Sequence, residues 1–406
     1  MMNADYDVVI IGGGMVGNTL ACALGDSDLK VAMIEARPAE MEWPPESIGM
    51  RVSAITAASQ QIFTALGAWE AMSAMRISPF REMQVWDAEG NGAVHFDSAE
   101  IGQDKLGHII ENRVIQAALT QRVAAFDNVE LRCPEQLEDL DTRGELAQLQ
   151  LKEGGTISAR LVIGADGANS RVRQHAGIET DGWPYHQSGI VTTVQTQLPH
   201  QETAWQRFMP TGPLAFLPLN NGGCSIVWST TPEHADELLA LSDEEFLIAL
   251  SHASEHRLGN VTEVGQRGAF PLNRQHAKTY IGNHLALIGD AAHTIHPLAG
   301  QGVNLGLLDA AALAEVLLNA HAKGRAIGAT HILRRYERWR KGDNLIMMTA
   351  MDGFKKLFGS EALSLKWLRN EGLSITDKLP LLKNQIMLHA MGYKGDLPAL
   401  ARYAAT

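Results

Sequence analysis

Four short apolar runs, at residues 8–11, 31–34, 161–163 and 285–288, are each followed by glycine or by an acidic residue. Continuous apolar runs of this length predict buried strands. Apolar residues at helical spacing follow the first run up to about Gly25, and they return after Gly302 until Gly324. This succession of strands and helices predicts an α/β domain.

The middle of the sequence has a different pattern, in which short apolar stretches alternate with Pro and Gly turns. Residues 82–96 predict a two-stranded hairpin, and residues 188–228 predict a β-rich unit inserted into the first domain. Helices are predicted at residues 59–72, 232–242 and 243–253, near residues 107–126 with Asn112 at the start, and through most of the C-terminal part.

Because the run at 285–288 follows the β-rich unit, the first domain is predicted to be discontinuous. We expect it to contain residues 1–75, 105–180 and 275–340. Residues 76–104 and 181–274 are expected to form the β-rich domain, and residues 341–406 a helical C-terminal region.

The first strand leads into a glycine turn with the spacing Gly12-x-Gly14-x-x-Gly17, and the second strand ends at Glu35. Gly12 allows a tight turn, Gly14 lets the backbone approach a pyrophosphate, and Gly17 lets the helix pack closely on the strand. A carboxylate at Glu35 would accept both ribose hydroxyls and repel a 2′-phosphate. The stretch therefore predicts a site for FAD or NAD rather than for NADP.

Two further strand ends carry an acid beside glycines. Asp166 and Gly167 follow residues 161–163, and Asp290 follows residues 285–288. The segment after Asp290 runs through a Gly-Gln-Gly turn at residues 300–302 into the long predicted helix. A helix start offers free N–H groups and a partial positive charge, so an anionic or electron-rich ligand is expected there.

Composition and charge narrow the class of protein. The net charge of −12 and the absence of a basic stripe argue against nucleic-acid binding. Three cysteines, Cys22, Cys133 and Cys224, stand far apart and fit packing roles in a reducing compartment. An acidic start without a basic region, and no apolar run near the roughly 18 residues of a membrane span, predict a cytoplasmic protein or one attached to a membrane face.

The three motifs together resemble those of the class A flavoprotein monooxygenases, the FAD-dependent aromatic hydroxylases. The second motif matches at Gly164, Asp166, Gly167, Ser170 and Arg173, and the third at residues 289–293, Pro297, residues 300–302 and Asn304. The resemblance covers nearly the whole chain. It implies a Rossmann-type FAD-binding domain with an inserted β-sheet substrate domain, as in p-hydroxybenzoate hydroxylase.

The resemblance also implies roles for single residues. Asp290 would hold the ribityl chain of FAD, although a helix-capping carboxylate would also explain it. Arg51 would face the pyrophosphate, with a surface salt bridge as the alternative. Pro297, Gly300 and Gly302 would form the environment of the flavin ring without a side-chain base, and an ordinary loop proline is the alternative for Pro297. The motifs and the resemblance together predict FAD contacts at Gly12, Gly14, Gly17, Glu35, Arg51, Asn112, Asp166, Asp290, Gly300, Gln301, Gly302 and Asn304.

His293 and His296 invite a metal or general-base interpretation, but no Cys or Glu completes a ligand set, and we expect both to bond the loop or flank the flavin. No metal is expected.

A second Gly-x-Gly-x-x-Gly is missing, so NADH or NADPH has no Rossmann site of its own. The family reaction reduces FAD with NADH or NADPH, adds O₂ to give a C4a-hydroperoxyflavin, and transfers oxygen to an electron-rich ring.

Residues 51–56, 111–119 and 372–393 are similar to the ubiquinone-biosynthesis hydroxylases within this class. Residues 203–219 and 268–277 look closest to the members that hydroxylate a demethoxyubiquinol ring. A polyprenylated phenol or quinol is the expected substrate, and residues 212–219 and 224–228 either line its channel or form ordinary core. The sheet around residues 215–218 and 225–228 would roof the ring.

Three alternatives stay open: a hydroxylase for another ring position, a hydroxylase of a small aromatic acid, and a flavin-binding scaffold without turnover. Residues 363–393 form an amphipathic tail that we expect to pack on the body of the protein. Contact of this tail with the inner membrane, or with other ubiquinone-biosynthesis proteins, is the alternative.

Overall fold

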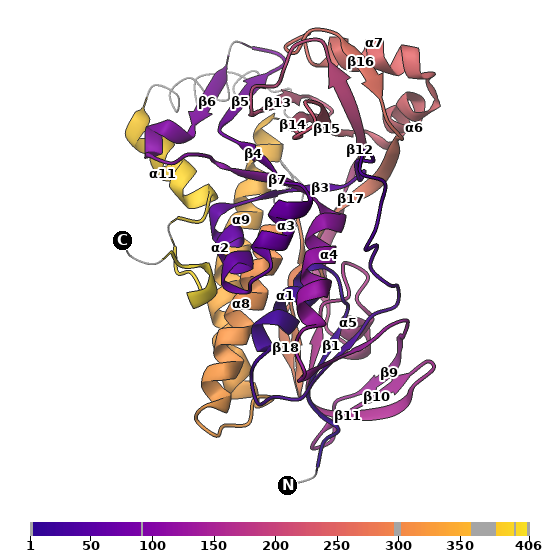
Figure 1. The fold of residues 1–406 in the computed structure, drawn as a ribbon, viewed down its shortest axis with the longest axis vertical. Coiled ribbons are helices and arrows are strands. Elements are labelled where there is room, and N and C mark those ends of the chain that lie inside the picture. Colours follow the sequence, from indigo (N-terminus) through magenta and orange to yellow (C-terminus); the bar gives the residue numbers. More distant parts are fainter. Residues whose placement is uncertain (1–2, 91, 296–301, 359–378, 394, 404–406) are drawn as a thin grey trace.

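The computed structural model describes residues 3–90, 92–295, 302–358, 379–393 and 395–403. An eight-stranded sheet forms the lower part of the molecule (Figure 1). Its central strands β19, β11, β1, β2 and β8 are parallel, as expected for strands of continuous apolar residues that are covered on both faces. The strands of this sheet are β1 (Tyr6–Ile11), β2 (Val31–Ile34), β8 (Val129–Arg132), β9 (Leu137–Asp141), β10 (Ala147–Leu151), β11 (Gly155–Gly164), β18 (Ile281–Gly282) and β19 (Leu285–Leu287).

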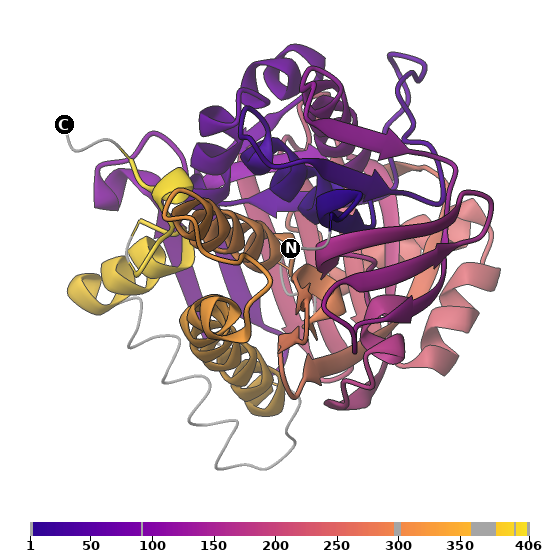
Figure 2. The same cartoon turned by 90° about the horizontal axis from the view of Figure 1, so that it is seen from below.

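Helices cover this sheet and share its core. α1 packs against both α4 and α8, and α8 packs against α9. The α8 and α9 helices run side by side along one flank of the molecule (Figures 1 and 2). The helices of this part are α1 (Met15–Leu24), α4 (Asn112–Val123), the short α5 (Arg171–His175), α8 (Gly302–His321) and α9 (Thr330–Phe358). Helix α4 begins at Asn112, as predicted.

Helix α8 corrects one expectation from the sequence. By length and composition, its 20 residues could cross a membrane, so the expectation that no apolar run approaches this length was wrong. In the fold, two thirds of its apolar window is buried, and Asp309 lies in its middle. These features are those of a core helix that packs on α1, α9 and the neighbouring strands.

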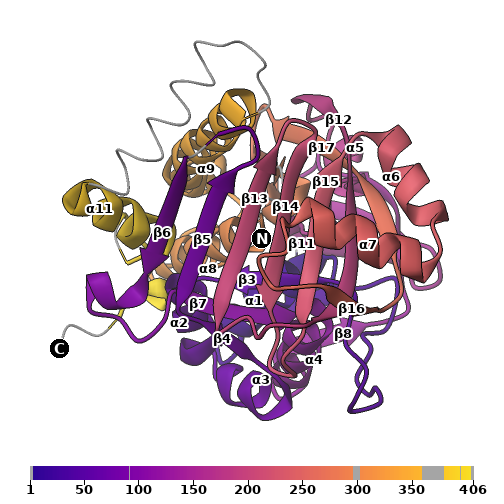
Figure 3. The ribbon, with the colours of Figure 1, turned by 90° about the horizontal axis from the view of Figure 1, so that it is seen from above.

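A nine-stranded sheet forms the upper part of the molecule. Helices α6 (Pro232–Ala240) and α7 (Asp243–Ala253) lie on its outer face (Figure 3), where a second apolar cluster packs around Trp228 and Phe246. A capping box between Ser242 and Glu245 begins α7. The strands are β5 (Glu82–Asp87), β6 (Ala93–Asp97), β12 (Thr180–Thr196), β13 (Thr203–Met209), β14 (Gly212–Pro218), β15 (Cys224–Thr230), β16 (Val261–Val264), β17 (Gly268–Ala277) and β20 (His293–Thr294).

A three-stranded sheet lies between these two parts (Figure 1). It contains β3 (Val52–Ile55), β4 (Ser78–Phe80) and β7 (Gly107–Glu111). The single helix expected at residues 59–72 is two helices, α2 (Ala57–Ala65) and α3 (Trp69–Met75), because Gly67 between them adopts a φ of 73°. The remaining elements are α11 (Pro380–Ala390) and the 3₁₀ turns η1 (Ser98–Ile101), η2 (Gly289–Ala291) and η4 (Ala399–Ala401).

Several other predictions about the elements are confirmed. The hairpin of β5 and β6 forms, and the strand near residue 285 joins the first sheet although 120 residues of chain separate it from β11. Cys22 and Cys224 are buried, and burial raises the pKa of each thiol to about 12. The boundaries of the domains stay a prediction.

Candidate functional site

Three loops meet at one edge of the eight-stranded sheet. Strands β1, β11 and β19 are parallel neighbours, so their carboxyl ends lie together. Backbone hydrogen bonds continue this alignment, from Ala165 N to Ile11 O at 2.8 Å and from Ile288 N to Gly164 O at 3.0 Å. The fold therefore gathers the three glycine and acid motifs, which lie more than 100 residues apart in the sequence.

Two cavities adjoin along this edge. One has a volume of about 460 Å³ and is lined by Gly12, Glu35, Asp166 and Arg171. The other has a volume of about 340 Å³ and extends from the loops to the underside of the nine-stranded sheet. Both are lined by Gly14, Ala165 and Gly167, so they form the two ends of one elongated cleft.

The glycine turn has the geometry that its spacing predicts. Gly12 has a φ of 105°, and a Cβ there would lie 2.5 Å from the carbonyl oxygen of Ala165. A Cβ on Gly17 would lie 1.9 Å from the carbonyl oxygen of Gly12, so only glycine lets α1 pack on the strand end. A Cβ on Gly14 would meet nothing within 4 Å, because Gly14 faces the cleft.

Glu35 closes the other side of this turn at the end of β2. One of its carboxylate oxygens accepts a hydrogen bond from Gly13 N at 2.6 Å, and the other accepts one from Arg37 N at 2.9 Å. The carboxylate therefore stays at the wall of the 460 Å³ cavity. The contact with a ribose stays a prediction.

Asp166 organises the second loop through side-chain and backbone donors. Its carboxylate accepts hydrogen bonds from Ser170 Oγ at 2.5 Å and from Arg171 N at 2.7 Å. These donors leave the carboxylate engaged with the loop itself, and the contact of Asp166 with FAD stays a prediction. Arg173, which is buried, donates to Ala291 O at 2.8 Å and thus ties the second loop to the third.

Asp290 lines the 340 Å³ cavity together with Gly302, the first residue of α8. Its side chain is exposed to the cavity while protein surrounds it on the other sides. Burial raises the pKa of Asp290, and the charges of His293 and Arg51 offset this only in part. Among the described residues, no side chain or backbone N–H donates to its carboxylate. His296, Pro297, Gly300 and Gln301 lie outside the described residues.

Behind this loop lies a buried polar network that the sequence analysis missed. Asp309, fully buried on α8, accepts hydrogen bonds from His293 Nε2 at 2.5 Å and Gly289 N at 3.2 Å. It also accepts from Arg340 Nε at 2.9 Å and Asn344 Nδ2 at 3.0 Å, both on α9. The loop that carries Asp290 is therefore fixed to two core helices. The available signal was an acid, Asp309, among the apolar residues in the middle of this helix.

His293 thus bonds the Asp309 carboxylate on α8, whereas we expected it to bond the loop or flank the flavin. Burial alone would raise the pKa of Asp309, but His293, Arg340 and Asn344 outweigh it and hold the pKa below its usual range. Within the described ranges, no group of three or more His, Cys, Asp and Glu residues could hold a metal ion.

Arg51 and Asn112 reach the same cavity from the three-stranded sheet. The Arg51 guanidinium lies 5.4 Å from the centre of the Phe270 ring, and no described carboxylate pairs with it. Asn112 Oδ1 accepts a hydrogen bond from Ser53 Oγ at 2.8 Å. Asn304 lies elsewhere, since its amide bonds Ala54 O at 2.8 Å between α8 and β3. The role of each in cofactor binding stays a prediction.

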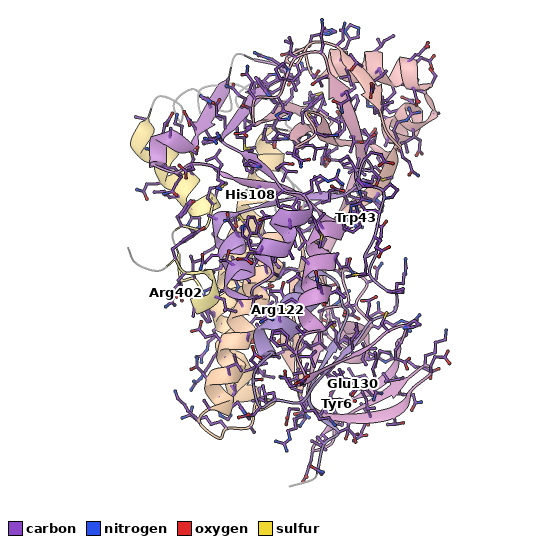
Figure 4. All side chains as sticks on the ribbon, in the orientation of Figure 1. Tyr6, Trp43, His108, Arg122, Glu130 and Arg402 are labelled. Carbon is purple, nitrogen blue, oxygen red and sulfur yellow. The ribbon has the colours of Figure 1, made fainter. Side chains whose placement is uncertain are left out.

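A second cluster that the sequence analysis missed holds the segment before Arg51. Glu111 is buried at the end of β7, accepts a hydrogen bond from Gly49 N at 2.5 Å and pairs with Arg113 at 2.8 Å. The Arg113 guanidinium lies 4.6 Å from the centre of the Trp43 ring, and Trp43 is labelled in Figure 4. Together these contacts fix where the segment enters the cleft.

The nine-stranded sheet forms the far wall of the 340 Å³ cavity. Alternate residues of β15 face opposite sides, so Ser225 and Val227 line the cavity while Ile226 and Trp228 pack in the cluster beneath α6 and α7. Val191 and residues 270–272 complete this wall. Leu217 belongs to a separate apolar cluster, so part of the predicted roof is ordinary core.

The cleft fits a flavin dinucleotide on three observations. It is long enough to have two distinct ends, its glycine turn is open at Gly14, and the Asp290 carboxylate, which has no donor among the described residues, projects into the end that the sheet covers. These features define the class of protein: the chain belongs to the family described as the FAD binding domain, whose model matches residues 5–344.

Relatives within this family are similar over almost the whole chain. The 3-demethoxyubiquinol 3-hydroxylase of Escherichia coli (strain K12) is 43% identical over 393 residues, which cover 97% of this chain and 100% of that protein. The mitochondrial ubiquinone biosynthesis monooxygenase COQ6 of Danio rerio is 39% identical, over 96% of this chain and 90% of that protein. Ubiquinone hydroxylase UbiL of Rhodospirillum rubrum is 36% identical, covering 95% and 89%.

Solved structures agree with this fold. The p-nitrophenol 4-monooxygenase PnpA from Pseudomonas putida DLL-E4 superposes with a TM-score of 0.77 at 19% identity, covering 96% of this chain and 99% of that one. The probable FAD-dependent monooxygenase pqsL from Pseudomonas aeruginosa superposes with a TM-score of 0.76 at 22% identity. The match covers 91% of this chain and 100% of that one. The chain is an FAD-dependent monooxygenase that uses NADH or NADPH and O₂ as co-substrates.

Proposed function

We propose that this protein hydroxylates the aromatic ring of a polyprenylated quinol in ubiquinone biosynthesis, and specifically that of a demethoxyubiquinol. The observation that carries the proposal is the 43% identity to a 3-demethoxyubiquinol 3-hydroxylase along the full length of both chains. Because the similarity includes the β-rich sheet as well as the FAD-binding part, it extends to the wall that would face the substrate.

The residues of the chain have separate tasks in this proposal. The turn at Gly12, Gly14 and Gly17 accommodates the pyrophosphate, Glu35 accepts the ribose hydroxyls, and Asp290 holds the ribityl chain. Arg51 faces the pyrophosphate in this proposal, and it lines the 340 Å³ cavity. Bound FAD supplies the chemistry of reduction by NADH or NADPH and of oxygen transfer to the ring.

Water must be excluded while oxygen is transferred, and the sheet wall provides this exclusion. Val191, Val227 and Phe270 present apolar groups to the cavity opposite Asp290. The substrate ring would lie between this wall and the flavin.

We propose a cytoplasmic location. Contact with the inner membrane or with other biosynthetic proteins through residues 363–393 remains a prediction, and residues 363–378 lie outside the described residues. In the described part, Met387 and Met391 pack into the apolar cluster beneath β4 and β14, which supports a tail that packs on the body.

Deletion of the gene followed by quinone extraction tests the proposal. We expect the accumulation of a demethoxyubiquinol intermediate, and complementation by the wild-type chain should restore ubiquinone. An intermediate that lacks oxygen at another ring position would assign that position instead, and an unchanged quinone pool would contradict the proposal. Failure of Asp290→Ala to complement would exclude a scaffold without turnover, provided that this variant is expressed and folded.

A further inference from the structure

Ser225 is a buried serine whose hydroxyl has no hydrogen-bond partner among the described residues. Ser225 lies in β15, is 1% exposed and lines the 340 Å³ cavity. The other described residues with such an atom, among them His108, Gln206 and Asn384, do not line this cavity. Ser225 therefore combines two properties that occur together at no other described position.

An unpaired buried hydroxyl is unfavourable, so such a group in a folded protein requires an explanation. Ser251 shows the usual arrangement, since its Oγ donates to Leu247 O at 2.7 Å and accepts from Val261 N at 2.9 Å. Ser251 is also buried, at 3% exposure. The hydroxyl of Ser251 thus serves the fold, whereas the hydroxyl of Ser225 has no structural partner.

The surroundings of Ser225 identify the kind of group that could pair with it. Val191, Val227 and Phe270 lie on the same wall, so the surroundings of this hydroxyl are largely apolar, with Asn273 of β17 as a further polar residue of the wall. Asp290 and Gly302 line the opposite side of the cavity, where the flavin would lie. An aromatic ring between them would have a largely apolar surface against its face, and the Ser225 hydroxyl, which is covered in this rotamer, would turn about χ1 to meet a ring substituent. Rotation about one bond moves Oγ between its staggered positions.

We infer that the Ser225 hydroxyl forms a hydrogen bond with an oxygen substituent, a hydroxyl or a methoxy group, on the aromatic ring of the substrate. Ser225 is then a specificity-determining residue that orients the ring above the flavin. This inference rests on the proposed function, because it takes the substrate to be an oxygenated ring. A serine can donate to a methoxy oxygen and can donate to or accept from a phenolic hydroxyl.

The test compares Ser225→Ala with the matched control Ser251→Ala. Thermal unfolding of the FAD-free protein measures the structural cost of each change. Titration of the holoenzyme with a short-chain demethoxyubiquinol analogue, followed by the absorbance of the bound flavin under anaerobic conditions, measures the dissociation constant. A second analogue carries methyl groups in place of the ring oxygens.

We expect opposite effects on stability and binding. Ser225→Ala removes an unpaired hydroxyl, so the Tm should rise by about 1–3 °C, while the dissociation constant of the oxygenated analogue should increase about tenfold. The preference of the wild-type enzyme for the oxygenated over the methyl analogue should largely disappear. Ser251→Ala should lower the Tm and leave both dissociation constants unchanged.

Each contrary result has a distinct meaning. A Ser225→Ala enzyme that binds and discriminates as the wild type does would overturn the inference and leave the proposed function intact. Weaker FAD binding with unchanged analogue binding would overturn it in favour of a contact with the flavin. A wild-type holoenzyme that neither binds nor hydroxylates the analogue would contradict the proposed function itself, and the inference with it.

Discussion

The loop of residues 289–293 has two sides, and an aspartate marks each. On the core side, Asp309 is fully buried and accepts four hydrogen bonds, and its pKa lies below the usual range. On the cavity side, Asp290 accepts none from the described residues, and burial raises its pKa. The same type of side chain thus holds the loop in one place and has no donor among the described residues in the other.

This difference distinguishes scaffold residues, which hold the fold, from site residues, which bind a ligand. A group that holds the fold has its hydrogen-bonding capacity filled by the protein, whereas a group that awaits a ligand keeps it free at a cost in stability. The glycine turn repeats the contrast, because a Cβ on Gly17 would clash with backbone and a Cβ on Gly14 would meet only the cleft. We expect scaffold variants to lose stability and site variants to lose affinity.

The largest effect is expected for Asp309→Asn. The change leaves the Arg340 guanidinium, which is 3% exposed, without its buried counter-charge, so the free energy of unfolding should fall by about 3–5 kcal/mol at pH 7. Chemical denaturation of the FAD-free protein measures this. Because the pKa of Asp309 is lowered in the folded state, its contribution is present above the unfolded pKa of about 3.9 and is lost as pH falls further. The difference in the free energy of unfolding between Asp309→Asn and wild type should therefore narrow below about pH 4.

Asp343→Asn is the control for this variant. Asp343 pairs with the same arginine at 3.3 Å, but its side chain is 50% exposed. Exposed ion pairs contribute little, so the change should cost less than about 1 kcal/mol. Equal losses for the two variants would show that burial does not distinguish the two carboxylates.

The glycine turn offers an intermediate effect, in a pair of variants with the same added methyl group. Gly17→Ala places a Cβ against the Gly12 carbonyl and should lower the free energy of unfolding by about 1–3 kcal/mol, since α1 must move. Gly14→Ala should leave the stability of the FAD-free protein within about 1 kcal/mol of wild type, yet weaken FAD binding at least tenfold by filling the turn. Denaturation and FAD titration of both variants measure the two quantities. Normal FAD affinity in Gly14→Ala would mean that the pyrophosphate lies elsewhere.

The sequence was sufficient for the local parts of this site. The turn at Gly12, the acid at Glu35 and the start of α4 at Asn112 each follow from spacing along a short stretch, because the physical constraint acts between near neighbours. Asp309 and Glu111 were missed because their partners lie at distant positions, such as Arg340 and Gly49. Ser225 could not be recognised either, since only the register of β15 shows which of its residues face the cavity.

Asp290→Asn should change stability least, and in the direction opposite to that of Asp309→Asn. The folded-state pKa of Asp290 is raised, so its protonated form is favoured by folding and the ionised form opposes it above the unfolded pKa of about 3.9. At pH 7 the neutral amide should therefore leave the FAD-free protein slightly more stable, with the gain disappearing below about pH 4. Loss of a hydrogen bond to the carboxylate should weaken FAD binding roughly 10- to 100-fold. Thermal unfolding at pH 4 and pH 7, with FAD titration at pH 7, measures both effects, and a loss of stability in Asp290→Asn would place Asp290 with Asp309 as part of the scaffold.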